Sequence, residues 1–176
     1  SISVVQTIAC FGDSDGSARM YVSGGMPNYT YLWDSGENGL IAQNLSSGYR
    51  HVSLTDDWGC IVMDSIYISE NPEIQPTVSL VQTVSCYGNT DGIVSVSSFG
   101  GVGAHTFFWS IDPVGHTNNP DTVFGLAEGS YYVTTQDVLG CEVLDSIYVS
   151  EPDPLTMQAS ALAWISCYGA DAVSYT

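Results

Sequence analysis

The stretch that decides the fold is Gly24–Trp33, GGMPNYTYLW, which returns later in the chain as Gly100–Trp109, GGVGAHTFFW. In both copies a glycine pair precedes a short run that alternates aromatic residues with others and ends in tryptophan. Alternation with a period of two residues is typical of a β-strand with one buried face. The interval of 76 residues between the copies indicates an internal repeat.

The repeat extends outward from this stretch in both directions. Cys10-Phe11-Gly12 returns as Cys86-Tyr87-Gly88 and again as Cys167-Tyr168-Gly169. Residues after the tryptophan return at an interval of 81, so five residues are inserted within 110–125 of the second copy. A surface loop absorbs such an insertion at little cost, because closure entropy grows only logarithmically with loop length. The later matches include Asp56 with Asp137, Cys60 with Cys141, and Glu70 with Glu151.

We therefore predict two complete repeats, at 1–74 and 75–155, followed by the N-terminal part of a third at 156–176. Short alternating runs separated by Gly, Asn, Asp and Ser predict six or seven strands per repeat and no helix. This pattern fits an immunoglobulin-like β-sandwich, with Trp33 and Trp109 in the two cores. Because the junctions are short and Pro-rich, they favour a semi-rigid string of modules.

Charge excludes several classes of partner. The chain of 176 residues has 19 acidic residues, two arginines (Arg19 and Arg50) and no lysine, for a net charge of −17. Nothing here would neutralise nucleic-acid phosphates or attach to anionic lipid. We expect no membrane insertion, since no apolar run of membrane-spanning length and no signal peptide occurs. Because the sequence opens in a strand, we expect it to be part of a longer protein.

The five cysteines predict disulfides and an oxidising compartment. None forms a Cys-x-x-Cys pair, which argues against zinc. Each repeat has one cysteine near its start and one before its last strand, so we predict Cys10–Cys60 and Cys86–Cys141, with the partner of Cys167 outside the sequence. Each bond would close a loop of about 50 residues, for roughly 4 kcal/mol of stabilisation. The alternative is a set of reduced, buried thiols.

Together these residues resemble the SprB repeat. The resemblance rests on Cys-[Phe/Tyr]-Gly, on the Gly-Gly and Trp stretch, and on the Asp-x-x-Gly-Cys and Glu-Pro elements. SprB repeats occur in giant surface adhesins of gliding bacteria of the Bacteroidota. The resemblance therefore implies type IX secretion, display at the cell surface as filaments, and a role in adhesion or gliding motility. It covers both complete repeats and the start of the third.

An acidic turn beside the first cysteine is a candidate calcium site. It contains Asp13 and Asp15, and Asn89 and Asp91 take these places in the second repeat. Calcium prefers six to eight oxygen ligands, and alternate Asp or Asn followed by Gly often opens such a loop. The alternative is a plain β-turn, which needs no metal.

Three further positions are candidates for O-glycosylation, namely Ser65, Thr122 and Ser146. Each follows an aspartate and precedes an aliphatic residue, which resembles the modification signal of exported Bacteroidota proteins. Two of them occupy identical repeat positions. The alternative is that Asp64 and Asp145 only start the last strand. Trp58, in the turn before Cys60, is interpreted as disulfide cover or as a surface contact.

We expect no enzymatic activity, because no catalytic fingerprint occurs and the three histidines fall at unmatched repeat positions. The main hypothesis is a structural or adhesive segment of a large secreted surface filament, with neighbouring repeats as partners. The alternatives are a module that binds surface polysaccharide or other cell-surface proteins, an accessory domain of a giant secreted enzyme, and a subunit that polymerises by strand donation.

Overall fold

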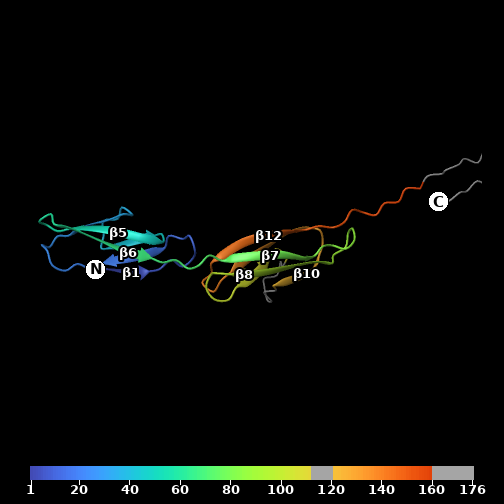
Figure 1. Cartoon of the computed structure of the whole chain (residues 1–176), viewed down its shortest axis with the longest axis horizontal. Coiled ribbons are helices and arrows are strands. Elements are labelled where there is room, and N and C mark those ends of the chain that lie inside the picture. The colour runs from blue at the N-terminus through green and yellow to red at the C-terminus, as the bar shows by residue number, and fades with distance from the viewer. Residues whose placement is uncertain (112–120, 160–176) are drawn as a thin grey trace, which may run out of the picture.

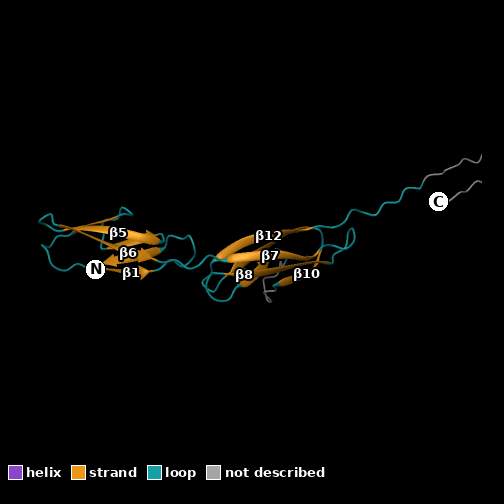
Figure 2. Ribbon diagram, in the orientation of Figure 1, coloured by secondary structure: helices purple, strands orange, loops and turns teal. Residues whose placement is uncertain are grey.

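The computed structural model describes residues 1–111 and 121–159, which form twelve β-strands joined by loops (Figure 2). No helix occurs among these residues, and hence none that is long and apolar enough to cross a membrane. The first six strands are β1 (Ile2–Gln6), β2 (Gly16–Met20), β3 (Thr30–Trp33), β4 (Ile41–Leu45), β5 (Gly48–Thr55) and β6 (Ile61–Ile68). The other six are β7 (Gln75–Gln82), β8 (Gly92–Phe99), β9 (Thr106–Trp109), β10 (Thr122–Leu126), β11 (Gly129–Gln136) and β12 (Glu142–Val149).

The strands form two sandwiches with the same topology. In the first, sheet β1-β2-β4 faces sheet β3-β5-β6; in the second, sheet β7-β8-β10 faces sheet β9-β11-β12. All pairings between these strands are antiparallel. This order is that of an immunoglobulin sandwich that lacks one edge strand. The predicted all-β, immunoglobulin-like fold is confirmed, and the two sandwiches lie end to end (Figure 1).

Each sandwich has its own hydrophobic core. Trp33 is 1% exposed and Trp109 is 4% exposed, and they lie in separate clusters, as predicted. The indole N–H of Trp33 donates to the carbonyl of Gly39 at 2.9 Å, so the one polar atom of this side chain is satisfied. The first cluster contains Ile8, Ala18, Met20, Trp33, Ala42, Leu45, Val52 and Ile68, and the second contains Val84, Val94, Val96, Trp109, Val123, Leu126, Val133 and Val149.

The predicted disulfide pairing is wrong. Cys10 is bonded to Cys141, in the other sandwich, while Cys60 and Cys86 are free and exposed. The reason is strand direction. The amide of Ile8 donates to the carbonyl of Ser69, so the Cys10 loop lies beside the end of β6, whereas Cys60 precedes its start. Eight residues of strand span about 26 Å, far beyond the roughly 7 Å between Cα atoms that a disulfide permits. Cys167 lies outside the described residues.

Candidate functional site: the joint between the sandwiches

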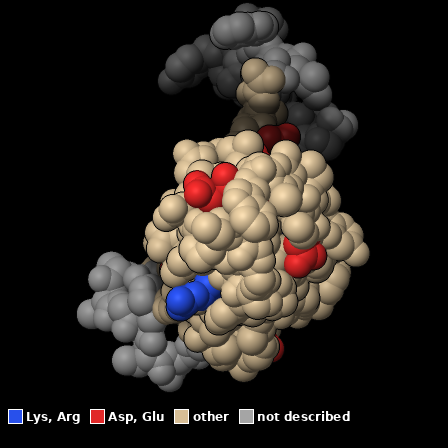
Figure 3. All heavy atoms as spheres, turned by 90° about the vertical axis from the view of Figure 1, so that its left-hand side faces the viewer, with Lys and Arg blue, Asp and Glu red and all other residues tan. Residues whose placement is uncertain are grey.

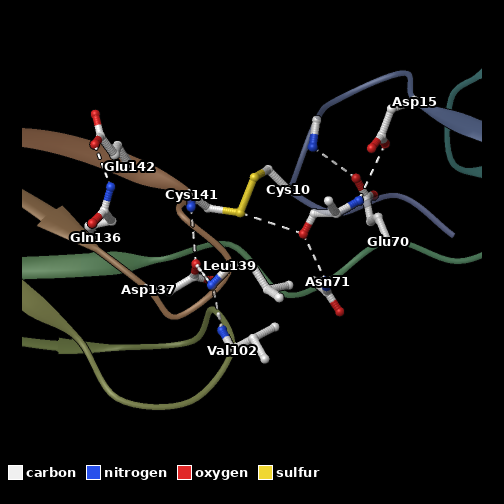
Figure 4. The surroundings of a disulfide bond; sticks show 12 residues. Cys10, Asp15, Glu70, Asn71, Val102, Gln136, Asp137, Leu139, Cys141 and Glu142 are labelled. Carbon is white, nitrogen blue, oxygen red and sulfur yellow. Dashed lines mark hydrogen bonds between the residues drawn. A yellow bond between two sulfur atoms is a disulfide. The ribbon is translucent and has the colours of Figure 1, made fainter.

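The disulfide joins the loop after β1 to the turn before β12 (Figure 4). The Cα atoms of Cys10 and Cys141 are 5.5 Å apart, within the usual range for a disulfide. Cys141 is only 8% exposed. Its Sγ lies 3.5 Å from the carbonyl oxygen of Ala9, which also accepts a hydrogen bond from the Nδ2 of Asn71 at 2.8 Å. The bond is thus set among polar contacts contributed by both the first sandwich and the linker.

Asp137 shapes the turn that presents Cys141. Its side chain is 6% exposed and accepts backbone N–H groups of Leu139 at 2.9 Å, Cys141 at 3.0 Å and Val102 at 3.0 Å. Burial alone would raise the pKa of Asp137, but the backbone donors, led by Val102, lower it below its ordinary value. The carboxylate therefore stays charged and holds the cysteine turn against the loop that follows β8.

The linker between the sandwiches packs on the glycine pair of the second sandwich. The amide of Gly101 donates to the carbonyls of Pro72 at 3.2 Å and Glu73 at 3.3 Å. Ile74 is 4% exposed beneath the same loop. A Cβ at Gly100 would lie 1.9 Å from the carbonyl oxygen of Glu73, and Gly100 has φ +80°, so both the space and the backbone require glycine. The glycine pair that marked the repeat is thus the seat of the linker.

A glutamate at the end of the first sandwich fixes the loop that carries Cys10. Glu70 accepts the amide of Gly12 at 2.9 Å and the hydroxyl of Ser47 at 2.7 Å. These two hydrogen bonds lower the pKa of Glu70, the bond from Gly12 contributing most. The second sandwich repeats the first of them, since Glu151 accepts the amide of Gly88 at 2.7 Å. In both sandwiches, a glutamate that follows the last strand therefore holds the loop that follows the first strand.

A cleft of about 350 Å³ opens beside the disulfide, between the two sandwiches. It is lined by the two bonded cysteines together with residues of the linker and of β12, among them Ile74 and Glu142. Within residues 1–111 and 121–159, no three His, Cys, Asp or Glu side chains are placed to hold a metal ion. The chemistry of this joint is a covalent cross-link surrounded by hydrogen-bonded loops.

Three of the four candidate calcium residues brace turns through side-chain hydrogen bonds. Asp15 accepts the amide of Ala9 at 3.3 Å and the Nε2 of Gln6 at 3.2 Å. Asp91 accepts the amide of Ser85 at 3.0 Å, and contacts with Ser85 lower the pKa of Asp91. Asn89 donates to the hydroxyl of the same serine at 3.2 Å, and Asp13 lines the cleft at the joint. Calcium binding at these residues stays a prediction.

Two of the three candidate glycosylation sites present accessible hydroxyls. Ser65 and Ser146 are exposed on β6 and β12, each at the edge of its sheet, whereas Thr122 is half-buried in β10. Asp64 and Asp145 lie within these strands rather than at their starts, and each accepts the amide of the serine that follows. Glycosylation itself stays a prediction.

Two features were missed or misread by reasoning from the sequence, one at the joint and one at the opposite end of the first sandwich. The glycine pair was recognised as a repeat marker but not as a docking seat. The interpretation of Trp58 as disulfide cover is wrong, since Cys60 has no disulfide and Trp58 is 78% exposed. A signal was available: in an immunoglobulin topology the connections β1–β2 and β5–β6 lie at opposite ends, so their cysteines cannot meet within one sandwich.

In comparisons with known proteins, one family model matches part of the chain. The model of the SprB repeat matches residues 2–38, which include the first Cys-Phe-Gly and the first glycine pair, and this confirms the resemblance to SprB repeats. No curated protein matches the sequence.

Three solved structures are similar in fold. The three N-terminal domains of the Highly Immunogenic Outer Capsid protein (Hoc) of bacteriophage RB49 are 16% identical, with 84% of this chain and 58% of that chain covered and a TM-score of 0.43. A C-terminal fragment of intimin, in complex with the intimin-binding domain of its receptor Tir, is 12% identical, with 85% and 63% covered and a TM-score of 0.41. The amphioxus IgVJ-C2 molecule is 11% identical, with 82% and 98% covered and a TM-score of 0.32. The chain thus spans less than two thirds of the first two.

Proposed function

Residues 2–38 belong to an SprB repeat, and from this premise we propose that the chain is a structural segment of a large cell-surface filament, without catalytic activity. The observation that carries the proposal is the bond between Cys10 and Cys141. It fixes two consecutive sandwiches end to end, as a stalk requires. The finer role is adhesion or gliding motility, with export by type IX secretion, as the SprB resemblance implies.

The position of the disulfide determines how the chain responds to tension. A force applied to the two ends of the chain passes from Cys10 directly to Cys141, so the residues between them are shielded from extension. Those two residues are 131 apart in sequence but their Cα atoms are only 5.5 Å apart. A fully extended chain of that length would span about 430–470 Å. The bond therefore limits how far a pulled segment can lengthen, which suits a filament between a cell and a surface.

Single-molecule pulling tests the mechanical part of this proposal. The oxidised chain should extend by about 430–470 Å less than the reduced chain when both are fully unfolded by force. The double variant Cys10→Ser/Cys141→Ser should show the long extension with and without reductant. Equal extension of the oxidised and reduced wild-type chains would contradict a tension-bearing role.

Antibodies against the folded chain test the cellular part. The antibodies should label intact producing cells. Digestion of the labelled protein by external protease should reduce the attachment of the cells to surfaces or their movement over them. Label found only after lysis would contradict display at the cell surface.

An exposed apolar groove favours protein binding as a second candidate function. It lies on the outer face of sheet β3-β5-β6, has a volume of about 310 Å³, and is lined by Leu32, His51 and Met63 among others. Leu32 is 56% exposed and Met63 is 78% exposed. Met63→Asp should abolish capture of a surface protein without changing stability, whereas a purely structural segment shows no such capture.

A further inference from the structure

Cys60 and Cys86 are the repeat counterparts of the two bonded cysteines. Cys60 corresponds to Cys141, and Cys86 corresponds to Cys10. Both bonded residues are at least partly buried in the joint, whereas both counterparts are free and exposed. The unjoined end of each sandwich therefore carries one half of the cysteine pair that joins the two sandwiches.

The seat of the linker shows the same difference between joined and open ends. Ile74, on the linker, is 4% exposed, whereas its counterpart Leu155 is 101% exposed. A Cβ at Gly100 would collide with the linker, whereas a Cβ at Gly24 would have nothing within 4 Å. The second sandwich is thus followed by an exposed apolar residue, Leu155. The first sandwich carries the equivalent of the glycine pair on which the linker packs, with no linker against Gly24.

The loops that present the free cysteines are already formed. Asp56 accepts the amides of Met26 at 3.1 Å and Cys60 at 2.9 Å, as Asp137 does for Val102 and Cys141. At the other end, Glu151 holds the Gly88 loop as Glu70 holds the Gly12 loop. Figure 3 views the chain from the open end of the first sandwich, and most of this face is uncharged, with the acidic side chains in separate spots.

We propose that two copies of this chain bind head to tail. Cys86 of one copy forms a disulfide with Cys60 of the other, and Leu155 of the first copy packs on the glycine pair Gly24–Gly25 of the second. The partner is a repeat of this kind, and a second copy of this chain supplies it. This goes beyond the proposed function, because surface display does not require that the open ends be joined.

The bond forms by thiol–disulfide exchange with a small disulfide such as oxidised glutathione. The thiolate of Cys86 attacks one sulfur of glutathione disulfide and releases one glutathione thiolate. The thiolate of Cys60 from the second copy then attacks the protein sulfur of the mixed disulfide and releases the second. Two protein thiols are oxidised to one disulfide, and one glutathione disulfide is reduced to two thiols.

The joining has a mechanical consequence. In sequence, Cys86 lies between Cys10 and Cys141. A bond from Cys86 to a second copy would therefore start within the loop that the existing disulfide closes. An array linked in this way has overlapping cross-links, so tension is carried across every joint by a covalent bond.

The test mixes two full-length variants in equal amounts, both with Cys167→Ser. One also carries Cys60→Ser, which leaves Cys86 as its free thiol, and the other carries Cys86→Ser, which leaves Cys60. After oxidation by glutathione disulfide at about 0.15 M salt, where charge repulsion is screened beyond about 8 Å, dimers are separated and their cross-links mapped by mass spectrometry. Random pairing makes the mixed dimer equal to the sum of the two like dimers. We expect it to exceed that sum several-fold, with Cys10–Cys141 intact.

Two controls separate docking from the simple exposure of a thiol. A chain with Cys60→Ser, Cys86→Ser, Cys167→Ser and Ser65→Cys carries its thiol on an exposed site of β6, and it should pair with the Cys86 chain only at the random share. Leu155→Asp, at a fully exposed position, should reduce the excess of the mixed dimer. A mixed dimer no more abundant than the sum of the like dimers overturns the proposal. An excess that Leu155→Asp leaves unchanged overturns the packing of Leu155 on the glycine pair.

Discussion

The two sandwiches use different residues, at the start of β5 and of β11, to donate a hydrogen bond to the corner that precedes the strand. In the second, the hydroxyl of Tyr131 donates to the carbonyl of Ala127 at 3.0 Å, which is the tyrosine corner of immunoglobulin folds. In the first, Arg50 takes this place, and its Nε donates to the carbonyl of Ser46, the counterpart of Ala127, at 3.0 Å. The Arg50 guanidinium also donates to the hydroxyl of Ser46 and to the carbonyl of Ser47.

This difference shows that the corner requires a hydrogen-bond donor at this strand position and does not require one particular residue type. The β4–β5 and β10–β11 corners each leave a carbonyl that needs a partner, and a phenol or a guanidinium reaches it from the same strand position. The ends of the sandwiches show the opposite relation. There the residues are equivalent, and their burial differs because one end is joined and the other is open.

The largest expected effect is on the separate cores. Trp33→Ala should lower the free energy of unfolding of the first sandwich by about 3–5 kcal/mol, because it leaves a cavity in a packed core. The second sandwich should keep its stability, since its core shares no residue with the first. Hydrogen exchange measured peptide by peptide in urea distinguishes the two sandwiches.

Trp58→Ala is the matched control for this change. Trp58 is 78% exposed, so we expect a change within about 0.5 kcal/mol. Equal destabilisation of both sandwiches by Trp33→Ala would show that they unfold as one unit.

The strands and cores of this molecule were predictable because they repeat. Alternation around Trp33 and Trp109 indicated both the strands and their buried faces. The disulfide partners were not predictable in this way, because a repeat shows which cysteines are equivalent but not which copies of the repeat are in contact. Pairing depends on the long axis of the sandwich, set by the eight residues of β6, and on the linker that brings two ends together.

The functional seat was hidden for a related reason. Gly24 and Gly100 are identical in sequence, and only Gly100 contacts a linker. A glycine pair before a strand indicates a turn as readily as a docking surface. The contact that distinguishes them comes from residues of a different repeat, so comparison between copies could not reveal it.

The next largest effect concerns the turns that present the cysteines. Asp137→Ala should destabilise the second sandwich by about 2–3 kcal/mol, because buried backbone donors lose their acceptor. It should also speed reduction of the Cys10–Cys141 bond, since the turn that shields Cys141 loosens. Thermal unfolding and the rate of reduction by dithiothreitol measure the two effects.

Asp56→Ala is the counterpart in the first sandwich and should cost less, because water reaches the donors of that open turn. A loss as large as that from Asp137→Ala would mean that the joint adds nothing to the burial of the turn.

A smaller effect is expected at the corners. Tyr131→Phe should cost about 1 kcal/mol, since it removes one hydrogen bond and keeps the ring. Arg50→Tyr should leave the first sandwich folded, with a corner of the second type. Urea unfolding measures both. If Tyr131→Phe costs nothing while Arg50→Met destabilises, the two corners are not equivalent.

The smallest effect is a pH dependence at the loop that carries Cys10. Because hydrogen bonds from Gly12 and Ser47 lower the pKa of Glu70 from its ordinary value of 4.5, the loosened loop binds a proton more readily than the formed loop. The stabilisation is therefore complete above pH 4.5 and is lost as the pH falls through the lowered pKa. The amide resonance of Gly12 should move over this range, and the shift should be small because the group is open to water. Glu70→Gln keeps an acceptor without the charge and should remove the titration, whereas an unchanged titration in that variant would assign it to another group.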